Sequence, residues 1–407
     1  MEDRGTKMTA IVALMAVFSL AICFIIIGAI SEELKKDLGI SNNDIGSLAL
    51  SLFLTSMIVQ LLIGPLLDKF GHKPLAIAGF LVTAVSMFLL AFATSLGMAF
   101  FACILLGVGA MCVNTVGNTL IPAVLFEGKD PARASNFGNA FFGLGYVLTP
   151  LLFSLFATMA IGYKTGVSII GGVMLVFLII ALGTRFPQVS TGFQFSMAIK
   201  LLGKGAVLIA AMALFCYVAL EISMGTWIKP YMTEILGGDT NPSAVANAGL
   251  VLSLFGVAMM VGRFLSASIK NLTAMGSKLI AGAALVSILA IGLMMMTRSS
   301  GMAIAAVLLT GLVFAPIFPT IVGVTFAKFE PRLYGSIFGI IFAVGLLGGT
   351  LVPKIIGSIS IGATVQQSLG IALAMAVILF VISLFIARVG RKTSPYASSR
   401  VEWGRGM

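Results

Sequence analysis

The sequence predicts an all-α membrane protein with twelve transmembrane helices, arranged as two pseudo-symmetric six-helix halves. The first observation is composition: 59% of the 407 residues are hydrophobic and only 10% are charged. Soluble domains are about half apolar and about a quarter charged. The second observation is that the apolar segments are unbroken, whereas the strands of a membrane β-barrel would alternate polar and apolar residues. The third is an internal repeat over half the chain.

Twelve apolar segments are long enough to cross a bilayer, which takes about 20 residues in a helix. Glycine, proline or charged residues bound each of them. The predicted helices span residues 8–30, 44–66, 74–95, 98–122, 134–158, 165–184, 205–229, 244–267, 277–297, 301–326, 333–358 and 365–388.

The longest polar interval between segments divides the chain into six helices plus six. We therefore expect an N-terminal half over residues 1–184, a cytoplasmic linker over 185–204 and a C-terminal half over 205–388. The polar, basic tail 389–407 is expected to be disordered at the membrane surface.

The repeat relates two segments that each begin with proline near an arginine, one at Pro131 and one at Pro331. Both continue through a Phe-Gly pair and end at a second proline, Pro150 and Pro353. The offset of 200 residues is half the chain. Two tandem six-helix halves are the architecture of a large group of secondary transporters.

The net charge of +11 fits the enrichment of Lys and Arg in cytoplasmic loops. With the N-terminus inside, 19 of the 25 Lys and Arg residues lie on the cytoplasmic side and six on the other. We therefore expect both termini in the cytoplasm and the chain in the plasma (inner) membrane. No basic stretch with interleaved aromatic residues indicates a nucleic-acid partner.

The loop after the second predicted helix combines glycines, an acid and bases. It runs from Gly64 through Asp68, Lys69 and Gly71 to Lys73. This resembles the signature loop of the major facilitator superfamily, a Gly-x-Leu-x-Asp-Arg-x-Gly-Arg-Lys pattern. A carboxylate at a helix end can cap a neighbouring helix N-terminus, so these residues are candidates for a latch that holds one conformation. The alternative is a plain solvated turn.

A degenerate copy of this loop follows the eighth helix, with Arg263 preceded by Gly262 and with Ser266 in place of the acid. Arg263 is therefore assigned to the same latch. The resemblance implies a major facilitator fold whose central cavity, lined by helices one, four, seven and ten, opens alternately to the two sides.

Further segments are similar to fucose–proton symporters and related carbohydrate transporters. Helix seven has a tyrosine, an acid and a tryptophan in a similar pattern, at Tyr217, Glu221 and Trp227. Other similar positions are Asn114, Asn118, Asn136 and Phe318-Pro319-Thr320. Helix one carries no acid, which departs from the fucose type, so any proton coupling depends mainly on Glu221.

Glu221 is the one acid well inside a predicted helix. A carboxylate in lipid is costly unless it is neutralised, paired or hydrated, so such residues usually mark substrate or proton paths. Glu221 is therefore the candidate coupling residue and a candidate substrate ligand. The alternative is a structural carboxylate bound to backbone or to Lys229.

The remaining candidate substrate-binding residues are polar or aromatic side chains within predicted helices. Either these groups line the cavity or they hold helices together, and Trp227 is either a stacking surface or an interfacial anchor. They are Gln60, Asn114, Asn118, Asn139, Tyr146, Tyr217, Trp227 and Phe318.

We expect secondary active transport of a small polar solute, a sugar in the first instance, coupled to protons. Na⁺ coupling, export of drugs or amphiphilic metabolites, and a receptor that binds without translocating remain alternatives. No nucleotide-binding loop, metal motif or nucleophile–base set is present in the sequence. We therefore expect no enzyme activity, cofactor or metal, and a monomer whose partners are solute, ion and lipid.

Overall fold

The computed structural model describes residues 2–40, 42–159, 161–187, 199–238, 242–360 and 362–386, and every regular element in these ranges is helical. The predicted linker 185–204 lies partly, and the tail 389–407 wholly, outside the described residues.

The elements before and after residues 188–198 are here termed the N-terminal half and the C-terminal half. The N-terminal half contains α1 (Glu2–Ala29), α2 (Ser31–Leu38), α3 (Asn42–Phe70), α4 (His72–Ala91), α5 (Leu96–Val124), η1 (Leu125–Gly128), α6 (Pro131–Thr158) and α7 (Tyr163–Gly183). The C-terminal half contains α9 (Gly205–Ile235), α10 (Pro242–Ala267), α11 (Leu272–Met296), α12 (Ser300–Phe314), α13 (Ile317–Phe326), η2 (Pro331–Leu333), α14 (Tyr334–Ser360), α15 (Val365–Ser368) and α16 (Gly370–Ile386).

Eleven stretches of the described residues are long and apolar enough to cross a membrane, and each overlaps one predicted segment. The one remaining predicted segment, 134–158, lies within α6, which is 28 residues long. The expectation of an all-α membrane protein is confirmed. The segment 301–326 is two helices, because the chain breaks between α12 and α13 around Pro316, which has no N–H to donate.

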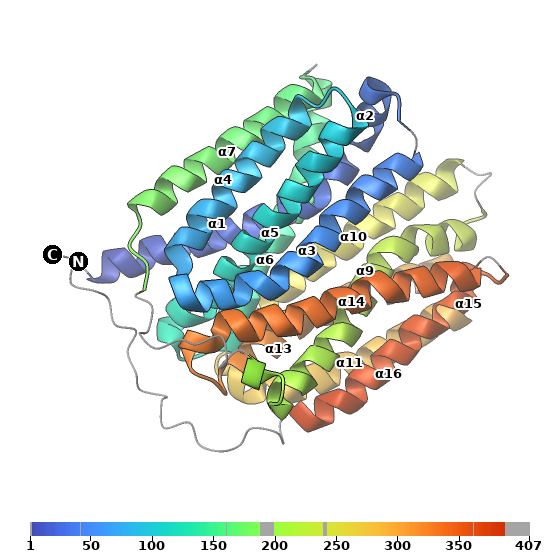
Figure 1. The fold of residues 1–407 in the computed structure, drawn as a ribbon. Coiled ribbons are helices and arrows are strands. Elements are labelled where there is room, and N and C mark those ends of the chain that lie inside the picture. The colour runs from blue at the N-terminus through green and yellow to red at the C-terminus, as the bar shows by residue number, and fades with distance from the viewer. Residues whose placement is uncertain are drawn as a thin grey trace.

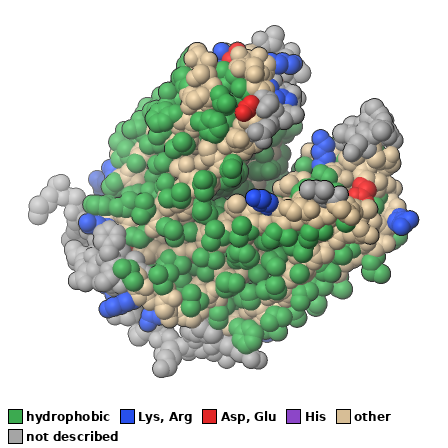
Figure 2. Space-filling model, turned by 45° about the vertical axis from the view of Figure 1, so that its right-hand side comes forward, with side chains coloured by type: hydrophobic (Ala, Val, Ile, Leu, Met, Phe, Trp, Pro, Cys, Tyr) green, Lys and Arg blue, Asp and Glu red, His purple; other side chains and the backbone are tan. Residues whose placement is uncertain are grey.

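The side faces of the bundle are apolar. Figure 2 shows that hydrophobic side chains cover most of the visible flank, while Lys, Arg and acidic side chains lie mainly towards the two ends. Leu62, Ile179 and Leu289 are each more than 60% exposed. An apolar belt of this size on a helical bundle matches a surface that faces lipid acyl chains.

The two halves meet at one end of the bundle, here called the closed end. There α3 of the N-terminal half and α14 of the C-terminal half run side by side (Figure 1), and α6 packs on α10. A Cβ built on Gly64 would lie 2.3 Å from the carbonyl oxygen of Gly335. The backbones of α3 and α14 therefore touch, which only small residues permit.

The halves separate towards the other end, here called the open end. In Figure 1 the helices diverge towards α2 and α15, and Figure 2 shows a hollow between the two lobes. Hydrogen bonds between the halves join α3 to α14 and α6 to α10 and α13, and Asp130, just before α6, to α11. They lie near the C-terminal ends of α3 and α10 and the N-terminal parts of α6, α11 and α14. The structure is therefore a conformation that is shut at one end and accessible from the other.

Candidate functional site

A buried ion pair lies near the middle of the bundle. Glu221, near the middle of α9, accepts a hydrogen bond from Nη2 of Arg263 on α10 at 3.0 Å. The Arg263 side chain is 4% exposed and the Glu221 side chain 24%. Glu221 thus has one accessible side and Arg263 lies behind it. The pairing satisfies a carboxylate that would otherwise be costly to bury.

Arg263 also connects the two halves. Its Nη1 donates to the backbone oxygen of Asn139 on α6 at 3.2 Å, and its guanidinium lies over the ring of Phe142, 5.4 Å from the centroid. One side chain of the C-terminal half therefore contacts both an acid of its own half and the backbone of the N-terminal half. A change in the charge of Glu221 would therefore change the electrostatic energy of Arg263, which makes this contact.

Four predicted amide side chains form a continuous hydrogen-bond network in the N-terminal half. Asn114 donates to Gln60 at 3.2 Å, Asn118 donates to Asn114 at 2.8 Å, and Asn139 donates to Asn118 at 3.2 Å. All four are at most 5% exposed. In this conformation their amides serve each other and join α3, α5 and α6, and the network ends at Asn139, whose carbonyl receives Arg263.

The predicted aromatic residues divide between two locations. Tyr217, one turn before Glu221, is fully buried and packs on Phe318, with ring centroids 6.3 Å apart. Tyr146 is 42% exposed and stacks on Phe142, which lies under Arg263. Trp227 lies apart from these aromatic residues, at the contact between α9 and α14, where its indole N–H donates to the carbonyl of Pro353.

Asp68 joins the halves at the closed end. Its two carboxylate oxygens accept the backbone N–H groups of Gly335 at 2.8 Å and Ser336 at 2.6 Å, in the first turn of α14. Free N–H groups and the helix dipole make a helix N-terminus a favourable site for a carboxylate. Gly64, one turn earlier, allows the close approach, and Gly71 begins the next helix with a φ of +84°, which favours glycine.

The other basic residues assigned to the latch have different positions. Lys69 lies over the ring of Phe70, 5.0 Å from its centroid, and Lys73 is exposed. Arg263 lies near the C-terminal end of α10, but its guanidinium binds Glu221 on α9 and the Asn139 carbonyl on α6. The structure places it in the ion pair, because its long side chain reaches back along the helix.

A second carboxylate, Asp130, was not anticipated from the sequence. It precedes α6, and its oxygens accept the backbone N–H groups of Leu272 and Thr273, both at 2.9 Å, and the Thr273 hydroxyl at 2.6 Å. Asp130 thus binds the N-terminus of α11 across the interface between the halves. Arg133 supports the same contact by donating to the carbonyl of Ala267 at 2.9 Å.

The repeat places an acid at the equivalent position of both halves. Asp130 stands immediately before Pro131, and Glu330 stands immediately before Pro331 at the start of the repeated segment. Glu330 forms an ion pair with Arg332 of its own half, so the repeated acid does not by itself mark a position at the interface.

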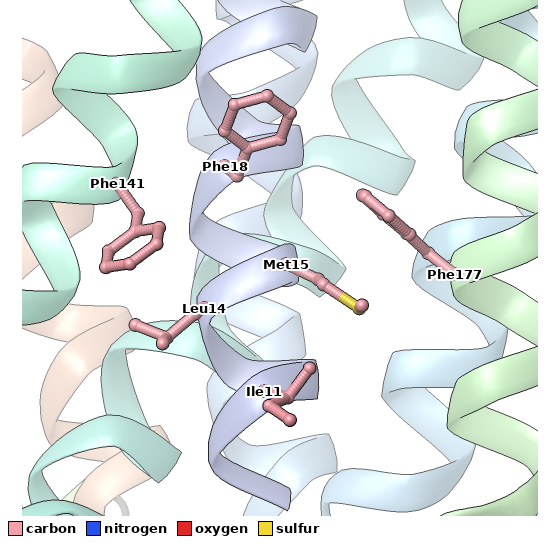
Figure 3. A pocket seen from close by; sticks show the side chains of 6 residues that line it. All are labelled: Ile11, Leu14, Met15, Phe18, Phe141 and Phe177. Carbon is pink, nitrogen blue, oxygen red and sulfur yellow. The ribbon is translucent and has the colours of Figure 1, made fainter. Parts of the chain in front are cut away.

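An apolar recess lies between α1, α6 and α7 (Figure 3). Six side chains line it: Ile11, Leu14, Met15, Phe18, Phe141 and Phe177. All six are hydrophobic, so the recess offers no hydrogen-bonding side chain to a polar solute. The polar groups converge instead at Glu221 and Arg263.

The two halves, the closed end and the buried ion pair define an integral membrane protein with the architecture of a secondary transporter. The family model of the Major Facilitator Superfamily matches residues 12–353. The chain belongs to this superfamily and is a transporter.

Solved structures show the same fold. The chain is similar to FucP, an MFS transporter solved in the outward conformation, with a TM-score of 0.77 at 16% identity over 93% of this chain and 99% of that chain. It is also similar to the proton:xylose symporter XylE, solved with 6-bromo-6-deoxy-D-glucose, with a TM-score of 0.74 at 16% identity over 95% and 96% of the two chains.

Curated relatives match over shorter regions. The Protein TsgA homolog of Erwinia tasmaniensis is 26% identical over 188 residues, 46% of each chain. The class H tetracycline resistance protein of Pasteurella multocida is 31% identical over 108 residues, 25% of this chain and 26% of that protein. The match thus spans about half or less of these relatives.

Proposed function

We propose that this protein transports a small polar solute, a sugar in the first instance, by alternating access coupled to protons through Glu221. The observation that supports this proposal is the buried pair of Glu221 and Arg263, which is bound to the opposite half through Asn139. A proton-accepting group at such a position can link its own charge to the arrangement of the halves.

The coupling works through the partners of Arg263. When Glu221 is charged, it holds Nη2 of Arg263 while Nη1 holds the Asn139 carbonyl, so α9, α10 and α6 are tied together. When Glu221 takes up a proton, its attraction for Arg263 falls, because a neutral carboxyl group no longer balances the guanidinium charge. The connection that runs from α9 through Arg263 to α6 is then broken at Glu221, which allows α9 to move relative to α10 and α6 and the closed end to open.

We infer the orientation from the charge distribution along the sequence, and we propose import as the direction of transport. With both termini in the cytoplasm, the closed end is cytoplasmic, because α14 and α11 begin there, next to the ends of α3 and α10. The open end then faces outward, and solute and proton enter together from outside the plasma membrane. Each chain carries both halves, so we propose that a monomer is sufficient.

The test is solute-driven proton uptake by the full-length protein in proteoliposomes, with a panel of sugars. The wild type is compared with Glu221→Gln and with a matched control, Glu234→Gln, which alters an acid on the same helix. Glu234 accepts the backbone N–H of Val365 towards the open end. Proton uptake with at least one sugar, lost in Glu221→Gln and kept in Glu234→Gln, supports the proposal.

Other outcomes assign other functions. Sugar uptake that requires a Na⁺ gradient and does not depend on the proton gradient would show that Na⁺, and not the proton, is the coupling ion. No sugar-driven flux, combined with proton-driven extrusion of an amphiphilic dye, favours an exporter. The similarity to the class H tetracycline resistance protein makes this the second candidate. Sugar binding without any flux leaves a transporter-like receptor.

A further inference from the structure

Arg263 has unused binding capacity in the centre of the protein. A guanidinium carries five N–H donors. One Nη binds Glu221 and the other binds the Asn139 carbonyl, while Nε is buried and makes no hydrogen bond. Within the described part of the chain, Arg263 is the only Lys or Arg that is buried. A buried polar N–H without a well-aligned acceptor is costly, so this donor is available to a ligand.

Glu221 occupies Arg263 incompletely. The two side chains are joined by a single contact of 3.0 Å, whereas a carboxylate can bind a guanidinium through two parallel hydrogen bonds. Glu221 is also the more exposed partner, at 24% against 4%. A carboxylate arriving from the accessible side can therefore replace Glu221 and make more hydrogen bonds than Glu221 makes.

The surroundings provide for the rest of such a ligand. The hydroxyl of Tyr217 is buried and makes no hydrogen bond of ordinary geometry, although Tyr217 lies near both charges of the pair. The exposed ring of Tyr146 extends the aromatic surface that begins at Phe142. A Cβ built on Gly225, one turn beyond Glu221, would meet no atom within 4 Å. Hydroxyl, aromatic surface and free space suit a sugar ring.

We propose that the transported solute is a sugar acid, whose carboxylate binds Arg263 and displaces Glu221. This inference rests on the proposed function and names the substrate class of the same site. Displacement frees Glu221 from its cation, so the acid then binds a proton more readily, and solute binding promotes proton binding. Tyr217 and Tyr146 are the other titratable side chains that interact with Glu221.

One negative charge is the best match for the site. A phosphate ester carries a charge of about −1.5 to −2, and a single guanidinium neutralises one unit. With Arg263 as the one buried base among the described residues, a second negative charge would lie unbalanced next to Glu221. A carboxylate avoids this cost.

The test is isothermal titration of the purified full-length protein with D-glucuronate and D-galacturonate, each compared with its neutral hexose, D-glucose or D-galactose. The variants are Arg263→Gln, Glu221→Gln and the double variant. Arg298→Gln is the matched control, since Arg298 is exposed in the loop between α11 and α12. The double variant covers the case in which Arg263→Gln leaves Glu221 unpaired and fails to fold.

A hydrogen bond to a charged group contributes about 1.5–3 kcal/mol, or roughly 10- to 150-fold in affinity. We expect at least one uronate to bind about tenfold or more tightly than its hexose in the wild type and in Arg298→Gln. Glu221→Gln should tighten uronate binding by about tenfold. The double variant should lose the preference for uronates.

Equal affinities for uronate and hexose, a preference that survives in the double variant, or no binding of either uronate overturns the inference. Proton uptake in proteoliposomes separates the two proposals. Hexose-driven uptake without a uronate preference removes the sugar acid and keeps the proposed function. Uronate binding through Arg263 without proton movement keeps the sugar acid and removes the coupling. Neither binding nor flux removes both.

Discussion

Replacing Asp130 with asparagine should open the closed end. The Asp130 carboxylate accepts three hydrogen bonds from the first turn of α11, from the backbone N–H groups of Leu272 and Thr273 and from the Thr273 hydroxyl, at 2.6–2.9 Å. Asparagine keeps one oxygen and turns an NH₂ group towards these donors. The variant therefore loses the negative charge, and at least one backbone N–H loses its acceptor.

The size of the effect follows from these contacts. A hydrogen bond to a charged group contributes about 1.5–3 kcal/mol, and the interaction of a charge with a helix N-terminus adds about 0.3–1 kcal/mol. Some of this loss is recovered, because N–H groups released by opening can bind water. We therefore expect a net shift of about 2–3 kcal/mol, roughly 30- to 150-fold towards the conformation with this end open.

Distances between spin labels can measure this shift. The four native cysteines are buried, so labels can be introduced by Ala78→Cys on α4 and Lys278→Cys on α11, two exposed positions near the closed end. Double electron–electron resonance should give one short distance between the two spin labels in the labelled parent and a second, longer distance in Asp130→Asn. Glu127→Gln, which changes an exposed acid paired with Lys129, is the control.

The same distance distribution in Asp130→Asn and in the parent would refute this reasoning. It would mean that water or neighbouring groups replace the carboxylate at no cost. A longer distance in Glu127→Gln as well would show that the label pair responds to any loss of charge in this loop.

Two further changes test the packing and the electrostatics. Gly335→Ala should destabilise the closed end by about 1–3 kcal/mol, since its Cβ would lie 2.4 Å from the Gly64 carbonyl; it should reproduce the longer label distance, and an unchanged distance would argue against backbone contact. Asp37→Asn should lower the thermal stability slightly at neutral pH, because Lys164 first and then Tyr163 lower the pKa of Asp37. This contribution to stability is complete above the usual carboxyl pKa, about 3.9, and is lost as the pH falls through the lowered pKa of Asp37. The melting temperatures of variant and wild type should therefore converge in acid. Melting temperatures that stay apart in acid would contradict the assignment.

The fold was predictable from the sequence because each bilayer crossing leaves a long apolar run. The break in the tenth predicted segment was not, since the residues around Pro316 are as apolar as the helices on either side. Hydropathy reports which residues leave water, and it does not report which backbone hydrogen bonds are kept.

The candidate site was predictable where a single residue violated its surroundings. Glu221 is an acid within an apolar run, so it was identified, but its partner was not. Arg263 stands four residues before the end of α10, where a base is expected for a cytoplasmic loop. Only the packing of α10 against α9 and α6 shows that its side chain turns inward. The role of Asp130 was equally hard to predict, since an acid before a proline is common in loops and does not indicate a contact between the halves.

The way Asp68 and Asp130 hold the halves together has a consequence for how the sequence can change. Both carboxylates bind main-chain N–H groups, and only the Thr273 hydroxyl adds a side chain to these contacts. Leu272 and Ser336 can therefore be exchanged without breaking these contacts, provided that the helix starts at the same place, whereas Gly335 is constrained by the close approach of Gly64. Two positions that contact each other in this way should leave almost no trace of correlated substitution among relatives.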